Sequence, residues 1–125
     1  AGEVGSGQSV TALYEIERME PAPRGQPLGW VRVRYRRVDT QAIEEIERPI
    51  LPRDFVPRIE AARPGLRLAA CAAEFAELLR RSPHAAGSRF ADVSRLLRPV
   101  ALEMKLDTRV AELVRLVELA GAISD

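Results

Sequence analysis

The sequence contains very little of the chemistry on which most catalytic and metal-binding sites depend. Its 125 residues include one cysteine, Cys71, and one histidine, His84. A single cysteine cannot form a disulfide within the chain, and a thiolate zinc cluster needs several. A single histidine excludes every metal site built on two imidazoles and leaves one imidazole that could act as a base. We therefore expect no metal ion and no cofactor.

The sequence also lacks a long apolar run and a charge of one sign. No stretch reaches the roughly 18 consecutive apolar residues of a membrane-spanning helix. Nineteen basic and 18 acidic residues leave a net charge of +1, which implies no overall attraction to nucleic acid or to an anionic membrane surface. With 46% hydrophobic and 30% charged residues, the composition is typical of a soluble globular domain.

The length of the chain suits one domain with one modest core. Residues 1–9 are rich in glycine and serine and are interpreted as a flexible lead-in. Residues 10–125 are predicted to form a single domain. The chain starts at Ala1 without a methionine, so we expect it to be a C-terminal fragment of a longer protein.

Alternating hydrophobicity predicts strands in the first half of the chain. Residues 10–17 alternate between apolar and other side chains, which favours a strand. The signal is clearest over residues 30–37, where Val31, Val33 and Tyr35 alternate with arginines. If these two strands pair antiparallel, glutamates of the first can lie opposite arginines of the second, and each such pair contributes roughly 0.2–1 kcal/mol.

Residues 41–50 fit two interpretations. Ile43 and Ile46 have the spacing of a helix turn, whereas Ile46, Arg48 and Ile50 have that of an edge strand. Pro49 opposes a helix that continues and is tolerated at a sheet edge. We assign a third strand here and keep the helix as the alternative.

Amphipathic periodicity predicts helices in the second half of the chain, with caps and breakers between them. The expected helices are a short one over 55–63 capped by Asp54, one over 66–81, one capped by Ser88 and interrupted or kinked near Pro99, and one from a cap at Asp107 to a stop at Gly121.

The second of these helices is expected to bury one stripe and expose another. Cys71 falls on the apolar stripe, with Leu68, Ala72, Phe75, Leu78 and Leu79, so its thiol should act as a small hydrophobic group. The charged residues fall on the opposite side, and Glu77 and Arg81 have the spacing of an ion pair along a helix. We therefore expect Arg67 and Glu74 to be exposed.

Strands come first and helices second, without alternation, which predicts an α+β fold. We expect a small antiparallel sheet of two to three strands within residues 10–50, followed by a half of three to four helices within residues 54–122. A sheet of this size is marginal alone. Its stability must therefore come from these helices or from strands elsewhere in a parent protein.

His84 is the one candidate for acid–base catalysis. It follows Pro83 in an expected loop, and Asp92 is the nearest carboxylate with a chance of orienting it. Ser82 and Ser88 flank it, but neither lies in the strand–turn–helix motif that positions a nucleophilic serine. We interpret His84 as an exposed loop residue and expect no enzymatic activity.

Arg32, Arg34 and Arg36 are the candidate binding residues. On a strand they project from one face at intervals of roughly 6–7 Å, which could meet phosphates or an acidic partner. Sheets that bind nucleic acid usually place aromatic residues among the basic ones for base stacking, whereas Trp30 stands at the start of this strand and Tyr35 on its expected buried side. We therefore expect a solvated face and no nucleic acid, with a small anionic ligand or a polyanion as the alternative.

Several strings resemble a known family. GSGQSVTALYEI at residues 5–16 and GWVRVRYRR at residues 29–37 resemble the segment that follows the von Willebrand factor A domain in bacterial YfbK-type proteins. Residues 66–85 resemble that family's alanine-rich helix, and D-x-R-x-x-E-L-V-x-L, from Asp107 to Leu116, resembles its final helix. The resemblance covers residues 3–120, while Ile43 to Pro64 departs from the pattern.

The resemblance implies a domain of unknown biochemical function that follows a metal-dependent adhesion module. The family's D-x-S-x-S metal motif belongs to the preceding domain and does not occur here, so no metal ligand is carried over. The resemblance also implies a bacterial cell-envelope protein, with membrane contact only through the parent. We expect a non-catalytic protein-interaction domain whose partner is the preceding A domain, or a second copy bound through a sheet edge.

Overall fold

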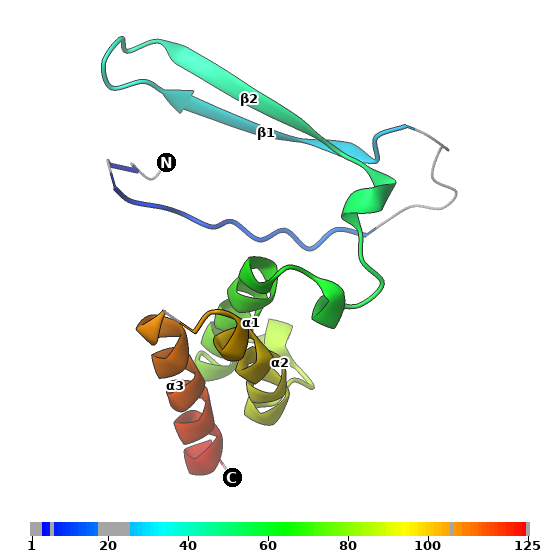
Figure 1. Cartoon of the computed structure of the whole chain (residues 1–125), viewed down its shortest axis with the longest axis vertical. Helices are drawn as coiled ribbons and strands as arrows, with labels where there is room; N and C mark the ends of the chain where they lie inside the picture. Colours follow the sequence, from blue (N-terminus) through cyan, green and yellow to red (C-terminus); the bar gives the residue numbers. More distant parts are fainter. Residues whose placement is uncertain (1–3, 6, 18–25, 106, 125) are drawn as a thin grey trace. The chain divides into compact units, whose positions relative to one another are not determined.

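The computed structural model describes residues 4, 5, 7–17, 26–105 and 107–124. Contacts within the chain gather in two compact units, which are described separately (Figure 1). One unit is Glu15–Pro57 and holds both described strands; the other comprises Ala1–Tyr14 with Arg58–Asp125 and holds the helices.

The strand unit is built on an antiparallel hairpin of β1 (Gly29–Arg36) and β2 (Ile43–Ile50) (Figure 1). Val33 lies opposite Ile46 at the centre of the register. The predicted strand over residues 30–37 is confirmed, and β2 settles the ambiguous residues 41–50 as a strand. With three helices after this sheet, the predicted α+β fold class is confirmed.

The predicted strand over residues 10–17 is wrong, because the structure assigns no strand there. β1 pairs with β2 instead, and Glu45 and Glu47 lie opposite Arg34 and Arg32, where glutamates of residues 10–17 were expected. The connection over residues 37–42 is much shorter than the proline-rich stretch before β1, so closing this hairpin costs less chain entropy. β2 thus supplies the acidic residues that lie opposite Arg32 and Arg34.

Proline replaces the predicted helix over residues 55–63 with shorter turns. Two 3₁₀ turns occur, Pro52–Asp54 and Ile59–Ala61. Pro57 and Pro64 disfavour the helical conformation of the residues before them, so a helix cannot run through this segment. Asp54 does not cap the predicted helix; it ends the first 3₁₀ turn, and its carboxylate accepts a hydrogen bond from the backbone N–H of the capping residue Leu51 at 2.8 Å.

The second unit contains three α-helices and a further 3₁₀ turn (Figure 1). The elements are α1 (Pro64–Leu79), a 3₁₀ turn at Pro83–Ala85, α2 (Phe90–Glu103) and α3 (Thr108–Ser124). The predicted cap at Asp107 is confirmed, because its carboxylate accepts the Arg109 backbone N–H at 3.0 Å. The predicted cap at Ser88 is wrong: the capping position is Arg89, whose side chain makes no capping hydrogen bond.

Neither of the two predicted helix breakers ends its helix. α2 continues through Pro99, which is exposed, so water can bond the Arg95 carbonyl that proline leaves without a donor. α3 continues through Gly121. A Cβ at Gly121 would lie 3.3 Å from the Cβ of Phe90, so this glycine permits a close approach of α3 to the start of α2.

The core of the helical unit comes from one stripe of each helix. Leu97, Val100 and Val117 have no exposed surface, and Cys71 is 2% exposed. Phe75 and Phe90 pack edge to face beside this cluster, with ring centres 6.0 Å apart, a favoured aromatic geometry. The predicted stripe of α1 is correct at four positions, but Leu79 and Ala72 are exposed.

Candidate functional site

The two faces of the hairpin differ in chemistry, as strand alternation requires. One face carries Val31 and Val33 on β1, with Ile46 opposite Val33 on β2. These three side chains are 50%, 52% and 57% exposed. We call them the apolar hairpin face. Two strands cannot cover their own apolar face, so it remains in contact with water.

The other face carries the predicted binding residues. Arg32, Arg34 and Arg36 alternate along β1 and are all exposed, so the structure brings them together as expected. Arg32 donates from Nε to the Glu47 carboxylate across the hairpin. This hydrogen bond, with the charge of Glu47, raises the pKa of Arg32.

Arg34 and Arg36 differ from Arg32, since neither forms an ion pair with another described residue. Arg34 lies opposite Glu45, but Arg36 lies opposite Ile43, which has no charge. Of the three arginines, Arg32 is therefore neutralised across the hairpin, whereas Arg36 has no charged residue opposite it on β2. We call Arg32, Arg34 and Arg36 the arginine row.

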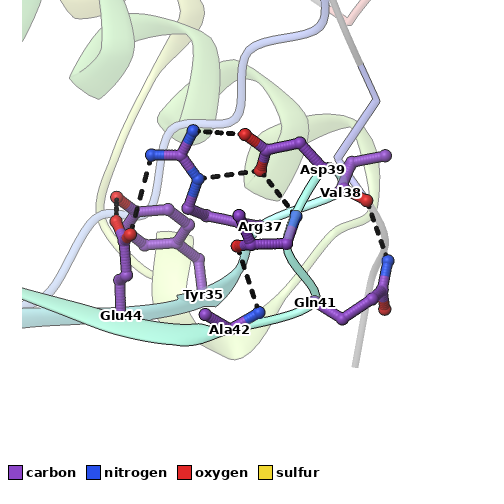
Figure 2. A network of polar contacts seen from close by, with 8 residues as sticks. Tyr35, Arg37, Val38, Asp39, Gln41, Ala42 and Glu44 are labelled. Carbon is purple, nitrogen blue, oxygen red and sulfur yellow. Dashed lines mark hydrogen bonds and ion pairs between the residues drawn. The ribbon is translucent and has the colours of Figure 1, made fainter.

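Polar contacts at the hairpin turn hold the register of the two strands (Figure 2). The Arg37 guanidinium donates to both carboxylate oxygens of Asp39, at 2.8 and 2.5 Å, and Nη1 lies 3.6 Å from Glu44. The hydrogen bond from Arg37 lowers the pKa of Asp39. Tyr35 donates its hydroxyl to Glu44 at 2.6 Å, which raises the pKa of Tyr35.

The backbone of this turn includes one unusual conformation. Gln41 has φ = 58°, in the left-handed region that most residues avoid. Its side-chain amide donates to the Val38 carbonyl at 2.9 Å (Figure 2). The Arg37 backbone N–H donates to the Ala42 carbonyl at 2.9 Å. These bonds compensate for the local strain and start the antiparallel ladder.

The helical unit has a groove of about 500 Å³ between α1 and α2. Arg67 lines it and is 7% exposed, so the expectation that Arg67 faces solvent is wrong. Its Nη2 contacts both carboxylate oxygens of Glu103, at 2.7 and 2.6 Å, and its Nε donates to the Ala62 carbonyl at 3.0 Å. Arg67 therefore ties the start of α1 to the end of α2.

The sequence did contain a signal for this burial. Arg67 stands four residues before Cys71 and Cys71 seven before Leu78, which places Arg67 on the edge of the buried stripe rather than opposite it. Nothing local pointed to Glu103, which is 36 positions away.

Glu74 and Cys71 lie in the same groove. Glu74 is half-buried, and its Oε1 has no hydrogen-bond partner among the described residues. Glu74 is thus less exposed than its predicted place opposite the apolar stripe implied. Burial raises the pKa of the Cys71 thiol, and nearby Arg67 opposes the shift. Cys71 is therefore protonated at neutral pH and packs as a small hydrophobic group.

Among the described residues, His84 forms no ion pair with an acidic side chain. It is exposed in the 3₁₀ turn, and its backbone N–H donates to Ser82 Oγ at 3.3 Å. Asp92, the carboxylate considered as its partner, contacts Arg89 and Arg95 instead. The predicted Glu77–Arg81 pair is also replaced, because Glu77 contacts Arg80. Across residues 4–124, outside the undescribed gaps, no three His, Cys, Asp or Glu side chains gather as a metal site would need.

The helices of the described residues are each too short or too polar to span a bilayer. The fold is thus α+β, with a compact helical unit and a separate unit built on a two-stranded hairpin. The chain matches the family model described as "Uncharacterized protein YfbK, C-terminal" over residues 1–123, and it belongs to this family. The match includes Ile43 to Pro64, which appeared to depart from the family pattern. Searches of the curated proteins and of the solved structures found no match.

Proposed function

We propose that this chain is a non-catalytic accessory domain that binds a neighbouring protein fold through the apolar hairpin face. The partner we favour is a von Willebrand factor A domain in the same parent protein, which the family resemblance implies. The parent would be an envelope-associated bacterial protein, and any membrane contact would be made by the parent. The proposal includes no nucleic-acid partner.

The observation that carries this proposal is the exposure of the apolar hairpin face. Val31, Val33 and Ile46 each leave about half of their surface in water. Full burial of such side chains contributes roughly 1.5–3 kcal/mol each, so covering the exposed halves would contribute on the order of 2–4 kcal/mol in all. A protein surface that covered this face would therefore stabilise the hairpin and be held by it.

The chemistry of the polar groups supports a binding role over a catalytic one. His84 has no acidic partner among the described residues, and Cys71 is buried and protonated. General acid–base and nucleophilic catalysis both need a second group within hydrogen-bond reach of the first.

A titration calorimetry experiment tests the proposal. The chain would be titrated with a separately produced A domain from a YfbK-type parent. Val33→Ser and Ile46→Ser should each weaken binding about tenfold or more, because each removes apolar area from the contact. Leu102→Ser, on a 71% exposed residue of α2, is the matched control and should bind normally. Absence of binding, or equal binding by the hairpin variants, would refute the proposal.

The arginine row favours a second candidate, the binding of an anionic ligand or polyanion. Arg34 and Arg36 are exposed without an ion-pair partner among the described residues. Arg34→Glu should then reduce retention on a heparin column, while Arg115→Glu, an exposed residue of α3, changes the net charge equally and should not. Equal retention of both variants would remove this candidate.

A further inference from the structure

The outer edge of β1 has backbone groups that point away from β2. Arg37 donates its N–H to the carbonyl of Ala42, which lies opposite it in the continued register. Successive residues of an antiparallel strand point their backbone groups alternately toward and away from the partner strand. Val33 and Tyr35 therefore bond toward β2, whereas the backbone groups of Arg32, Arg34 and Arg36 point outward.

These outward positions coincide with the arginine row. A strand added antiparallel to this edge would place its side chains directly opposite Arg32, Arg34 and Arg36, on the same face. Its alternate side chains would extend the apolar hairpin face next to Val31 and Val33. The edge therefore specifies two properties of a partner strand at once: negative charge at every second position and apolar character between.

Charge disfavours a second copy of the hairpin as that partner. An antiparallel pair of β1 edges centred on Val33 would place Arg32 of one copy opposite Arg34 of the other, and like charges directly opposite destabilise a sheet. A pair of β2 edges centred on Ile46 would oppose Glu45 and Glu47 in the same way. Pairing of β1 with β2 of another copy would place arginines opposite glutamates. Such head-to-tail pairing does not form a closed dimer, so it would extend into filaments.

We propose that the outer edge of β1 accepts an extended segment of another polypeptide in which acidic residues alternate with apolar ones. This inference rests on the proposed function and specifies the form of the partner. Backbone hydrogen bonds to Arg32, Arg34 and Arg36 supply affinity, and the arginine row selects the acidic residues. Arg36, opposite uncharged Ile43, contributes most to this selection because β2 offers it no carboxylate.

Amide hydrogen exchange measured by NMR tests the proposal on the whole chain. The probe is a short peptide of alternating glutamate and valine, and the control peptide has lysine in place of glutamate. The glutamate peptide should slow exchange at the amides of Arg32, Arg34 and Arg36 about tenfold or more, while Val31 and Val33, already bonded to β2, change little. Slow exchange of the arginine amides in the chain alone, or uniform protection with the peptide, would overturn the proposal.

A charge reversal separates specific pairing from unfolding. The double variant Arg34→Glu/Arg36→Glu should lose the glutamate peptide and gain the lysine peptide, which a variant that merely unfolds cannot do. Arg115→Glu should keep the preference of the parent sequence. If both peptides bind the double variant equally, charge does not select the strand and the proposal fails. The A-domain titration would be unaffected by that failure, since it depends on Val33 and Ile46.

Discussion

The two units of the chain bury their apolar residues to very different extents. In the helical unit, Leu97 and Val117 have no exposed surface. In the hairpin, Val33 and Ile46, the residues at the centre of the register, are each more than half exposed. The helices therefore supply their own core, whereas the two strands of the hairpin cannot cover their own apolar face. The proposed function rests on this difference.

Ion pairs show the same contrast. In the helical unit the side chain of Arg67 is 8% exposed and contacts Glu103. In the hairpin the side chain of Arg32 is 60% exposed and contacts Glu47. A charge removed from water depends on its partner much more than one that water can solvate. The first pair is thus part of the helical packing, and the second is part of a surface.

The largest expected effect comes from truncating the helical core. Leu97→Ala should lower the free energy of unfolding by about 2–5 kcal/mol, because it leaves a cavity among fully buried neighbours. The matched change in the hairpin, Val33→Ala, should lower it by about 1 kcal/mol or less, because its side chain is already half in water. Urea unfolding followed by circular dichroism measures both. Equal losses would break the comparison between the units.

A smaller effect is expected at the buried ion pair. Arg67→Met keeps the length of the aliphatic stem but leaves the Ala62 carbonyl and Glu103 without their donor, which should cost about 1–3 kcal/mol. Arg32→Met in the exposed pair should leave the midpoint of urea unfolding unchanged. A stable Arg67→Met variant would show that packing of the stem, and not the ion pair, holds α1 to α2.

The smallest effect concerns the hairpin turn and its dependence on pH. The hydrogen bond to Glu44 raises the pKa of Tyr35, so this contact stabilises the hairpin below the ordinary tyrosine pKa of about 10 and is lost as pH rises through the raised value. Phenolate absorbance in a Tyr14→Phe background follows Tyr35 alone. Glu44→Ala should shift the titration of Tyr35 to lower pH.

Glu45→Ala is the control for this titration, because Glu45 neighbours Glu44 but belongs to the opposite face of β2. An unchanged titration in Glu44→Ala would contradict the contact in Figure 2. The stability that Asp39 contributes should depend on pH in the opposite direction. Arg37 lowers the pKa of Asp39, so this contribution to the turn is present at neutral pH and is lost as pH falls through the lowered value.

The spacing of apolar residues predicted a helix or strand best where a single periodicity runs through the whole segment. Strict alternation over residues 30–37 predicted β1 and the side on which its arginines lie, since each strand residue faces opposite to the next. The same alternation over residues 10–17 failed. A strand also needs a partner to bond its backbone, and β2 reaches β1 through a much shorter connection, whereas residues 10–17 pair with no described strand. Alternation thus showed which segments could form strands, but not which of them would find a partner.

The amino-acid order alone determined the strand-then-helix class, the two chemically distinct faces of β1 and the cap at Asp107. These features depend on neighbours a few positions apart, which share one period or one turn. Only the tertiary structure decided that Arg67 is buried against Glu103, that Gly121 admits Phe90 rather than ending a helix, and that β1 pairs with β2. Each of those outcomes depends on contacts between residues far apart in the sequence. The spacing of residues along the chain does not show which distant residues will meet.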